Sequence, residues 1–480
     1  MTLETAPSTQ VLLDLEDACP GVLGEPLPGS SVPFWPQVRS AFMFAIMDHF
    51  FATTSVPKSS SRVQIGRRAL AAFGPSRRDP RWLRGPRPLV YFTSGTTTHL
   101  VNSRTRNWLV GDFAEAFPRE SVILQSAPLP AQLPAFEPTR SLSRFDLRAG
   151  VRARLGRAAA TVARDVERMV SEYARLLDIP IAEDRIRAIT NSATYHQTLQ
   201  PFREHSILKM IDRLDPLVAL IQGASYGTGS SLVLALKRRG VHVVEPQHGW
   251  IGPSHGAYNF GAAMFEPELA AMLPDELLTF GEYWSSGIRA PYATTSIGKP
   301  HLEAMCRGAQ AWERRPQEVL LVSSVADPGE ATEFGRALAD ALPDGWTLRF
   351  RPHPSERVVV RDRYAALLEH RRVALDLEHD VYVSLRSSRV VVGVASTVLF
   401  EALALGCRVF AVANAVSPYY VGDLFGSLVH GPDSVTDIIG NLAPPSRSVS
   451  RETLDALWKP NATQNFREWA DRRLRTTTSG

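Results

Sequence analysis

The segment from Val390 to Gly406 constrains the fold of this chain more than any other part of the sequence. It opens with the run Val-Val-Val-Gly-Val, and small or β-branched apolar residues in such a run are typical of a buried strand. Ser396 and Thr397 can cap a following helix, Gly406 can end it, and a second strand is predicted over residues 408–413. A strand, a helix and another strand in this order predict an open α/β sheet with parallel strands.

The same segment carries groups that suit a nucleotide. A helix that begins at the carboxyl end of a parallel strand presents free N–H groups and a positive dipole end, and both stabilise a phosphate. Glu401 lies in the first turns of the predicted helix, where its carboxylate can accept two hydroxyls of a ribose. The alternative interpretation is an ordinary helix cap followed by a surface glutamate.

Composition narrows the class of protein. The 480 residues are 44% hydrophobic and include three cysteines, which have no metal-like spacing and fit a reducing compartment. A net charge of +4 does not indicate nucleic-acid binding. The acidic N-terminus does not resemble a signal peptide, and the most apolar segment, 34–51, is too short and polar to span a bilayer. We therefore expect a cytoplasmic protein.

A long arginine-rich helical pattern over residues 146–178 has two interpretations. The first is a solvated helix face, and the second is a peripheral contact with the anionic inner face of the plasma membrane. The apolar segment 34–51 is predicted to form a helix that packs on the core, and residues 1–33 are predicted to be an extended lead-in.

Two series of alternating strands and helices, with a break near residues 275–315, predict two Rossmann-like domains that face each other across a cleft. A terminal helix over 451–475 is expected to cross back to the first domain. The predicted parts are an N-terminal extension (1–87), a first domain (88–275), a second domain (276–445) and a C-terminal helix and tail (446–480).

Gln247-His248-Gly249 directly follows a predicted strand of the first domain. Glycine after the histidine allows a tight turn, and a neutral imidazole in the cleft could remove a proton from a hydroxyl. His255 and Tyr258 lie close by in the sequence. The alternative interpretation is a histidine that hydrogen-bonds its own loop.

Three further loops follow predicted strands. In Arg351-Pro352-His353-Pro354 two prolines fix the loop, and both Arg351 and His353 can donate hydrogen bonds to a phosphate. The loop of the first strand contains Thr96 and His99, which could approach an acceptor or a phosphate. The Gly-rich stretch 223–230 is not a P-loop, because no Gly-Lys-Ser/Thr follows it.

The order of these motifs resembles bacterial GT-B glycosyltransferases of surface-polysaccharide assembly, a group that includes capsule, Kdo and sialyltransferase-like enzymes and the teichoic-acid glycerophosphotransferases. The resemblance covers about residues 216–440. The motifs that carry it are Gln247-His248-Gly249, Phe280-Gly281-Glu282, Ile297-Gly298-Lys299-Pro300, Arg351-Pro352-His353-Pro354, and Ser396-Thr397 with Glu401.

The resemblance implies a GT-B fold with an N-terminal helical extension and a C-terminal crossing helix. It implies that His248 is the base, that His353, Ser396 and Thr397 hold the donor phosphate, and that Glu401 binds the ribose. The acidic motif that supplies the base in sialyltransferases has no clear counterpart here, which moves the base onto His248. The expected site residues are catalytic His248, Gln247 and Gly249; donor-binding Arg351, His353, Ser396, Thr397 and Glu401; and secondary Thr96, His99, His255, Tyr258 and Gly281.

The function that follows from the resemblance is metal-independent transfer of a sugar from a nucleotide-sugar donor to a glycan or lipid-linked glycan acceptor. The donor is expected to be CMP- or UDP-linked, and no cofactor, metal or nucleic-acid partner is expected. Three alternatives stay open. They are a CDP-polyol phosphotransferase of teichoic-acid type, a UDP-sugar 2-epimerase with a linker similar to Gly298-Lys299-Pro300, and a catalytically silent glycan-binding module.

Overall fold

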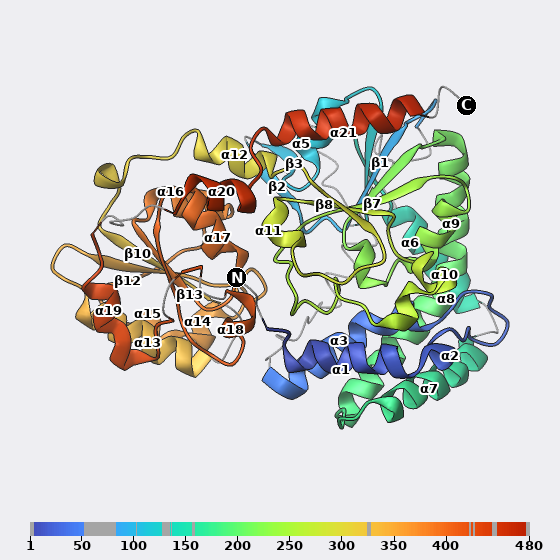
Figure 1. The fold of residues 1–480 in the computed structure, drawn as a ribbon, viewed down its shortest axis with the longest axis horizontal. Helices are drawn as coiled ribbons and strands as arrows, with labels where there is room; N and C mark the ends of the chain where they lie inside the picture. Colours follow the sequence, from blue (N-terminus) through green and yellow to red (C-terminus); the bar gives the residue numbers. More distant parts are fainter. Residues whose placement is uncertain are drawn as a thin grey trace.

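The computed structural model describes residues 4–51, 83–101, 103–126, 135, 137–155, 159–323, 328–421, 424–425, 428–443 and 449–476. These residues form two α/β domains, each built on a parallel sheet, which lie side by side in Figure 1. The predicted class, a GT-B arrangement of two Rossmann-like domains, is confirmed. No helix among the described residues has both the length and the apolar character needed to cross a membrane.

The first sheet has seven strands in the order β5-β4-β1-β6-β7-β8-β9, and every neighbouring pair is parallel. Its strands are β1 (Leu89–Thr93), β4 (Ser121–Gln125), β5 (Thr139–Ser141), β6 (Val218–Ile221), β7 (His242–Pro246), β8 (Glu276–Thr279) and β9 (Ala293–Ser296). A separate antiparallel hairpin, β2 (Thr98–Val101) and β3 (Arg104–Asn107), follows β1.

The second sheet has five parallel strands in the order β12-β11-β10-β13-β14. They are β10 (Glu318–Val322), β11 (Thr347–Arg351), β12 (Val373–Leu375), β13 (Val390–Gly393) and β14 (Arg408–Ala411). All four residues of β13 are buried, as the apolar run predicts for a central strand covered on both faces.

Helices cover both sheets. In the first half of the chain they are α1 (Pro7–Ala18), α2 (Pro20–Leu23), α3 (Trp35–Phe51), α5 (Gly111–Ala116), α6 (Ser143–Leu155), α7 (Ala159–Leu176), α8 (Glu183–Leu214), α9 (Ser230–Lys237), α10 (Pro267–Ala270) and α11 (Glu282–Ser285). In the second half they are α12 (Pro300–Cys306), α13 (Pro328–Ala341), α14 (Val360–Arg363), α15 (Ala365–Leu368), α16 (Val381–Ser387), α17 (Thr397–Ala404), α18 (Ser417–Tyr420), α19 (Val435–Ile439), α20 (Arg451–Leu457) and α21 (Ala462–Thr476).

The predicted helix over 451–475 is divided into α20 and α21. The predicted crossing is confirmed, since α21 lies against α5 of the first domain (Figure 1). Phe466 of α21 stacks on Phe113 of α5, with ring centroids 4.2 Å apart. Arg473 and Trp469 of α21 both donate hydrogen bonds to the buried carboxylate of Glu276 in β8. Helix α21 therefore belongs physically to the first domain.

The break between the domains differs from the predicted boundary at residue 275. β8 pairs with β7, and β9 pairs with β8, so both strands extend the first sheet. The first domain therefore continues to the linker Gly298-Lys299-Pro300, whose proline is the first residue of α12. Spacing along the chain could not locate this boundary, because a short strand gives no local signal of which sheet supplies its hydrogen-bond partner.

The N-terminal extension also differs from the predicted lead-in. Residues 7–18 form α1, and Glu16 of this helix is buried in an ion pair with Arg39 of α3, with Oε1 and Nε 2.6 Å apart. Arg39 also donates to the Asn259 carbonyl at 2.7 Å. The predicted helix over 34–51 is confirmed as α3 and packs into the core, whereas residues 52–82 of the extension lie outside the described residues.

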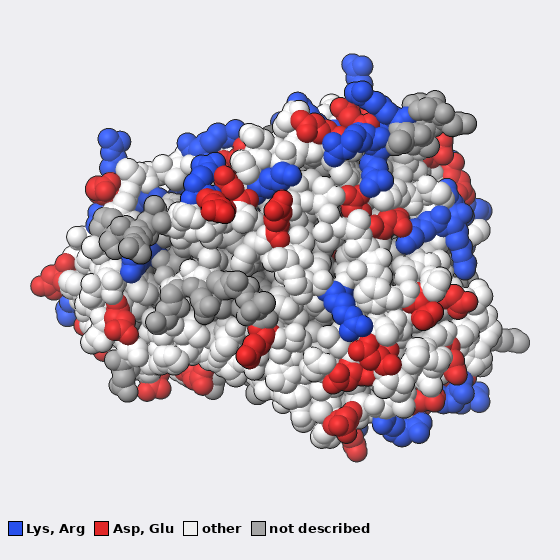
Figure 2. Space-filling view, viewed as in Figure 1, with Lys and Arg blue, Asp and Glu red and all other residues white. Residues whose placement is uncertain are grey.

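The arginine-rich pattern over 146–178 forms two helices, α6 and α7. On α7 the arginines alternate with Asp165, Glu167 and Glu172, and Figure 2 shows basic and acidic side chains intermixed over the face in view. This distribution favours the solvated-face interpretation, while the peripheral membrane contact stays a prediction.

Candidate functional site

The second sheet has a crevice where its strand order reverses. From β10 the chain runs outward through β11 and β12 on one side, and it then returns to β13 and β14 on the other. The loops that leave β10 and β13 therefore diverge and open a crevice between them. Ligands of open α/β sheets bind in such crevices, at the carboxyl ends of the strands. About 530 Å³ of space, part of it open to solvent, lies at this point, and its polar lining includes Ser323, Glu330 and Asn414.

The helix that begins after β13 is capped as predicted. Ser396 Oγ accepts a hydrogen bond from the Val398 N–H at 3.3 Å, and Gly406 ends the helix with a positive φ of 71°. Because β13 borders the crevice, the N-terminus of α17 with Ser396 and Thr397 lies at the same sheet edge. Binding of a phosphate there stays a prediction.

His353 is exposed in the loop after β11, and its Nδ1 lies 2.7 Å from Ser355 Oγ. β10 separates β11 from β13, so the loops of His353 and Ser396 start about 10 Å apart at the usual strand spacing. Arg351 is different. Its guanidinium is buried and donates to Asp376 at 3.0 Å and to Ser384 at 3.1 Å, so it stabilises the second domain internally.

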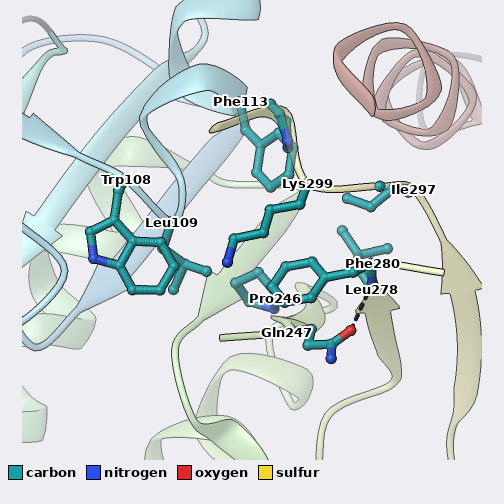
Figure 3. A pocket seen from close by; sticks show the side chains of 11 residues that line it. Trp108, Leu109, Phe113, Pro246, Gln247, Leu278, Phe280, Ile297 and Lys299 are labelled. Atoms are coloured by element: carbon teal, nitrogen blue, oxygen red, sulfur yellow. Dashed lines mark hydrogen bonds between the residues drawn. The ribbon is translucent and has the colours of Figure 1, made fainter. Parts of the chain in front are cut away.

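Glu401 does not line the crevice. Its carboxylate is buried and forms an ion pair with Lys299 of the linker. The Lys299 ammonium also lies 4.8 to 5.7 Å from the ring centroids of four aromatic side chains, Phe280, Trp108, Tyr382 and Trp458. Figure 3 shows Lys299 reaching between Trp108 and Phe280. The structure thus places Glu401 at the junction of the domains, away from the predicted ribose site.

The first sheet reverses its order between β1 and β6. Here the Ser94 N–H donates to Gln222 Oε1 at 3.0 Å, and Thr96 Oγ1 lies 2.7 Å from Ser94 Oγ. His248 reaches this point from the neighbouring strand β7. Its Cε1 lies 4.0 Å from where a Cβ on Gly223 would stand. The structure therefore brings His248 to the switch point of the first sheet, together with the loop of Thr96.

Gln247 holds the His248 loop in place. Its Oε1 accepts from the Phe280 N–H at 2.7 Å (Figure 3), and its Nε2 donates to the Gly249 carbonyl at 2.9 Å. Gly249 does not have a positive φ, and nothing lies within 4 Å of a Cβ built on it, so the backbone there does not require glycine. Gly281 is required sterically, because its Cβ would stand 2.1 Å from the Ala456 carbonyl oxygen.

Glu245 is a site residue that the sequence analysis missed. It is fully buried at the end of β7, where Oε2 accepts from the Ser225 N–H at 2.7 Å and Oε1 accepts from the Tyr258 hydroxyl at 2.8 Å. His248 Nδ1 lies 3.6 Å from Glu245 Oε1. The available signal was a charged residue inside an apolar strand, three positions before the histidine.

His255 lies next to Glu245 and His248, but both of its ring nitrogens already have hydrogen-bond partners. Nδ1 accepts from the Ala257 N–H at 3.2 Å, and Nε2 lies 3.0 Å from the Tyr226 hydroxyl. Burial and the neighbouring His248 lower the pKa of His255 to about 3. It is therefore neutral and fully hydrogen-bonded near pH 7, which makes it a poor proton acceptor.

His99 lies in a different cluster. Its ring centroid is 5.8 Å from that of His301, which follows the linker, and 6.4 Å from that of His379 in the second domain. Burial is the main factor that lowers the pKa of His99. Within the described ranges, no group of three or more His, Cys, Asp or Glu side chains is arranged to hold a metal ion.

The carboxyl edges of the two sheets face each other. Trp250, after β7, donates its Nε1–H to the Tyr420 carbonyl at 2.8 Å and stacks on the Tyr420 ring with centroids 4.2 Å apart. His99 and His379 meet across the same junction, after β1 and β12. The fold and the site therefore define a two-domain α/β protein of the GT-B class, with His248 at the edge of the first sheet that faces the second domain.

Comparisons with known proteins add solved structures only, since no family model and no curated protein matches this chain. A UDP-GlcNAc 2-epimerase from Neisseria meningitidis bound to UDP-GlcNAc is 12% identical and has a TM-score of 0.46; the match covers 81% of this chain and 99% of that chain. The Methanocaldococcus jannaschii enzyme in complex with UDP-GlcNAc and UDP is 12% identical with a TM-score of 0.46, covering 82% and 99%. A UDP-N-acetylglucosamine 2-epimerase from Rickettsia bellii is 11% identical with a TM-score of 0.44, covering 81% and 96%.

These three proteins carry the activity that the sequence analysis kept as an alternative, and none of them is named as a glycosyltransferase. The main prediction of sugar transfer is thus unconfirmed. At these identities and TM-scores the similarity does not identify a reaction.

Proposed function

We propose that this protein is an enzyme that acts on a nucleotide-activated sugar. The observation that carries the proposal is the position of His248, a partly exposed imidazole at the switch point of the first sheet, two residues before Trp250, which contacts Tyr420 of the second domain. In doubly wound domains the switch point of each sheet is the ligand-binding edge. A ligand that spans the cleft would present its nucleotide to one domain and its sugar to the other.

The second domain would hold the nucleotide and stabilise its phosphate. The free N–H groups of α17 and the positive end of its dipole favour the negative charge that develops on a leaving phosphate. Ser396, Thr397 and the imidazole of His353 could each donate a further hydrogen bond. Glu330 and Asn414 line the adjacent crevice and replace Glu401 as candidates for contact with the nucleoside.

Two reactions use the same base and the same leaving group. In a 2-epimerisation His248 would take the proton from the sugar carbon beside the anomeric centre while the nucleotide leaves, which gives an unsaturated sugar. Return of the nucleotide to the anomeric carbon, with addition of a proton to the opposite face of the neighbouring carbon, would give the epimer. In a transfer His248 would take the proton of an acceptor hydroxyl, which then bonds to the anomeric carbon. The first reaction needs only the nucleotide sugar, whereas the second needs an acceptor.

One feature favours the transfer reaction as a second candidate. Phe44 of α3 is 52% exposed, and its ring centroid lies 6.4 Å from that of Tyr226, which in turn lies 5.7 Å from His248. An exposed aromatic ring that is separated from the base by one tyrosine ring offers a surface on which an acceptor could stack.

The test is an NMR assay of nucleotide sugars with UDP, CMP, CDP, GDP and TDP as the nucleotides, run in D2O without acceptor and then with glycan acceptors. Deuterium uptake at the sugar carbon with appearance of the 2-epimer identifies an epimerase, and acceptor-dependent release of nucleotide identifies a transferase. His248→Ala should abolish either reaction, while the exposed His205→Ala should not. Absence of binding by calorimetry for every nucleotide would overturn the proposal.

A further inference from the structure

Glu245 and His248 lie side by side among groups that carry little other charge. Both carboxylate oxygens of Glu245 accept hydrogen bonds from neutral donors, the Ser225 N–H and the Tyr258 hydroxyl. Within the described part of the chain, no lysine or arginine forms an ion pair with Glu245, and the basic side chain within 4 Å is the imidazole of His248, 3.6 Å away, which carries a charge only when protonated. Arg39, the nearby guanidinium, is paired with Glu16.

The three tyrosines around Glu245 cannot supply a positive charge and stay protonated. Burial is the main factor that raises the pKa of Tyr226, Tyr258 and Tyr292, and the Glu245 charge raises each of them further. A fully buried carboxylate without a cation is costly. His248 Nδ1 is itself buried and has no hydrogen-bond partner among the described residues. The Glu245 carboxylate therefore lacks a cation, which a protonated His248 can supply, and His248 Nδ1 lacks a hydrogen-bond acceptor, which the carboxylate can supply.

We propose that Glu245 is the positioning residue for His248. A small rotation of the imidazole would turn the 3.6 Å contact into a hydrogen bond from Nδ1–H to Glu245 Oε1. That bond fixes the tautomer in which Nε2 carries the lone pair. A substrate proton taken by Nε2 produces an imidazolium, whose charge the carboxylate stabilises until the proton leaves from Nε2 again.

The inference rests on the proposed function for its catalytic meaning, but the pairing itself can be measured without any substrate. Burial lowers the pKa of His248, and the Glu245 charge raises it. Removing the charge should therefore leave burial unopposed and lower the pKa of His248 further. Removing only the tyrosine hydrogen bond should leave the carboxylate in place.

The first measurement is the tautomer of His248 in the full-length wild-type protein, read from ¹⁵N shifts after assignment with His248→Ala. We expect Nδ1 to be protonated and Nε2 to be bare in the neutral form. The opposite tautomer would overturn the proposal, and this measurement does not depend on any Glu245 variant being folded.

The second measurement is the NMR titration of His248 in Glu245→Gln, with Tyr258→Phe as the matched control. We expect the pKa to fall by roughly one unit or more in Glu245→Gln and to change much less in Tyr258→Phe. An unchanged or raised pKa in folded Glu245→Gln would contradict the inference.

Once a substrate is known, Glu245→Gln should lower kcat by about 10²-fold or more and leave KM and nucleotide affinity near wild type. Its pH–rate profile should shift to lower pH with the His248 pKa, which a merely structural role would not produce. A correct tautomer and titration in a protein that binds no nucleotide would refute the proposed function and leave the Glu245–His248 pair intact.

Discussion

The Lys299 ammonium and the Glu401 carboxylate form a buried ion pair that joins the linker to α17 of the second domain. Aromatic rings from both domains surround the ammonium and exclude water from it. Cation–π contacts and the carboxylate together replace the lost hydration. This pair therefore fixes the junction about which any movement of the two domains would occur.

Breaking the pair should destabilise the protein strongly. Glu401→Gln or Lys299→Met leaves one buried charge without its partner, which costs about 3–5 kcal/mol of unfolding free energy. The double variant Lys299→Met/Glu401→Leu should recover much of this loss, because no charge remains. Chemical denaturation measures the free energy of unfolding of all three variants.

Arg451→Ala is the control for this prediction, since its ion pair with Asp455 lies on the surface and should contribute less than about 1 kcal/mol. A Glu401→Gln variant of wild-type stability that had lost affinity for nucleosides would restore the ribose assignment made from the sequence.

The attachment of α21 should depend on pH. Burial alone would raise the pKa of Glu276, but hydrogen bonds from His242, Thr295 and Trp469 and the charge of Arg473 outweigh it and lower the pKa to about 2. Since this lies below the ordinary value of 4.5, the stabilisation is complete above about pH 4.5 and is lost as the pH falls towards 2. The shift corresponds to about 3 kcal/mol.

Glu276→Gln should therefore unfold more easily at pH 7, and its stability should fall less steeply than that of the wild type between pH 4.5 and 2. Thermal melts over this range measure the slope. Glu468→Gln, on the exposed face of α21, should retain the wild-type slope; a parallel loss in both variants would refute the role of Glu276.

Two glycines of the predicted motifs should respond differently to alanine. A Cβ on Gly281 would stand 2.1 Å from a backbone oxygen that cannot move without displacing α20, so Gly281→Ala should cost several kcal/mol of stability. Gly249 has open space, so Gly249→Ala should stay within about 1 kcal/mol of wild type. Equal effects in denaturant titrations would show that the close approach at Gly281 is not rigid.

His353 should contribute to nucleotide affinity without contributing to the fold. The side chain is exposed, so His353→Ala should retain the wild-type melting temperature. Loss of one charge-assisted hydrogen bond to phosphate should weaken nucleotide binding by about 1.5–3 kcal/mol. Calorimetry with the nucleotide that binds in the assays of the proposed function tests this prediction. The control is His370→Ala, because the imidazole of His370 pairs with Asp340. Equal affinity in both variants would remove His353 from the site.

Local signals in the sequence were sufficient for much of the fold. The apolar run before Ser396, the cap at Ser396 and the glycine at 406 together determined β13 and α17, because burial, capping and a left-handed C-terminus each act within a few residues. The same reasoning placed His248 and His353 after strands, at the sheet edges where ligands bind. It also predicted that the terminal helix returns to the first domain.

Only the tertiary structure decided which distant groups meet. Lys299 pairs with Glu401 and Glu16 pairs with Arg39, although nothing in the local sequence distinguishes these charges from solvated ones. The same holds for β8 and β9, which joined the first sheet through hydrogen bonds to β7 and to each other. Pairing across long separations depends on which surfaces the whole chain buries together, and so the role of Glu401 could not be predicted from the sequence.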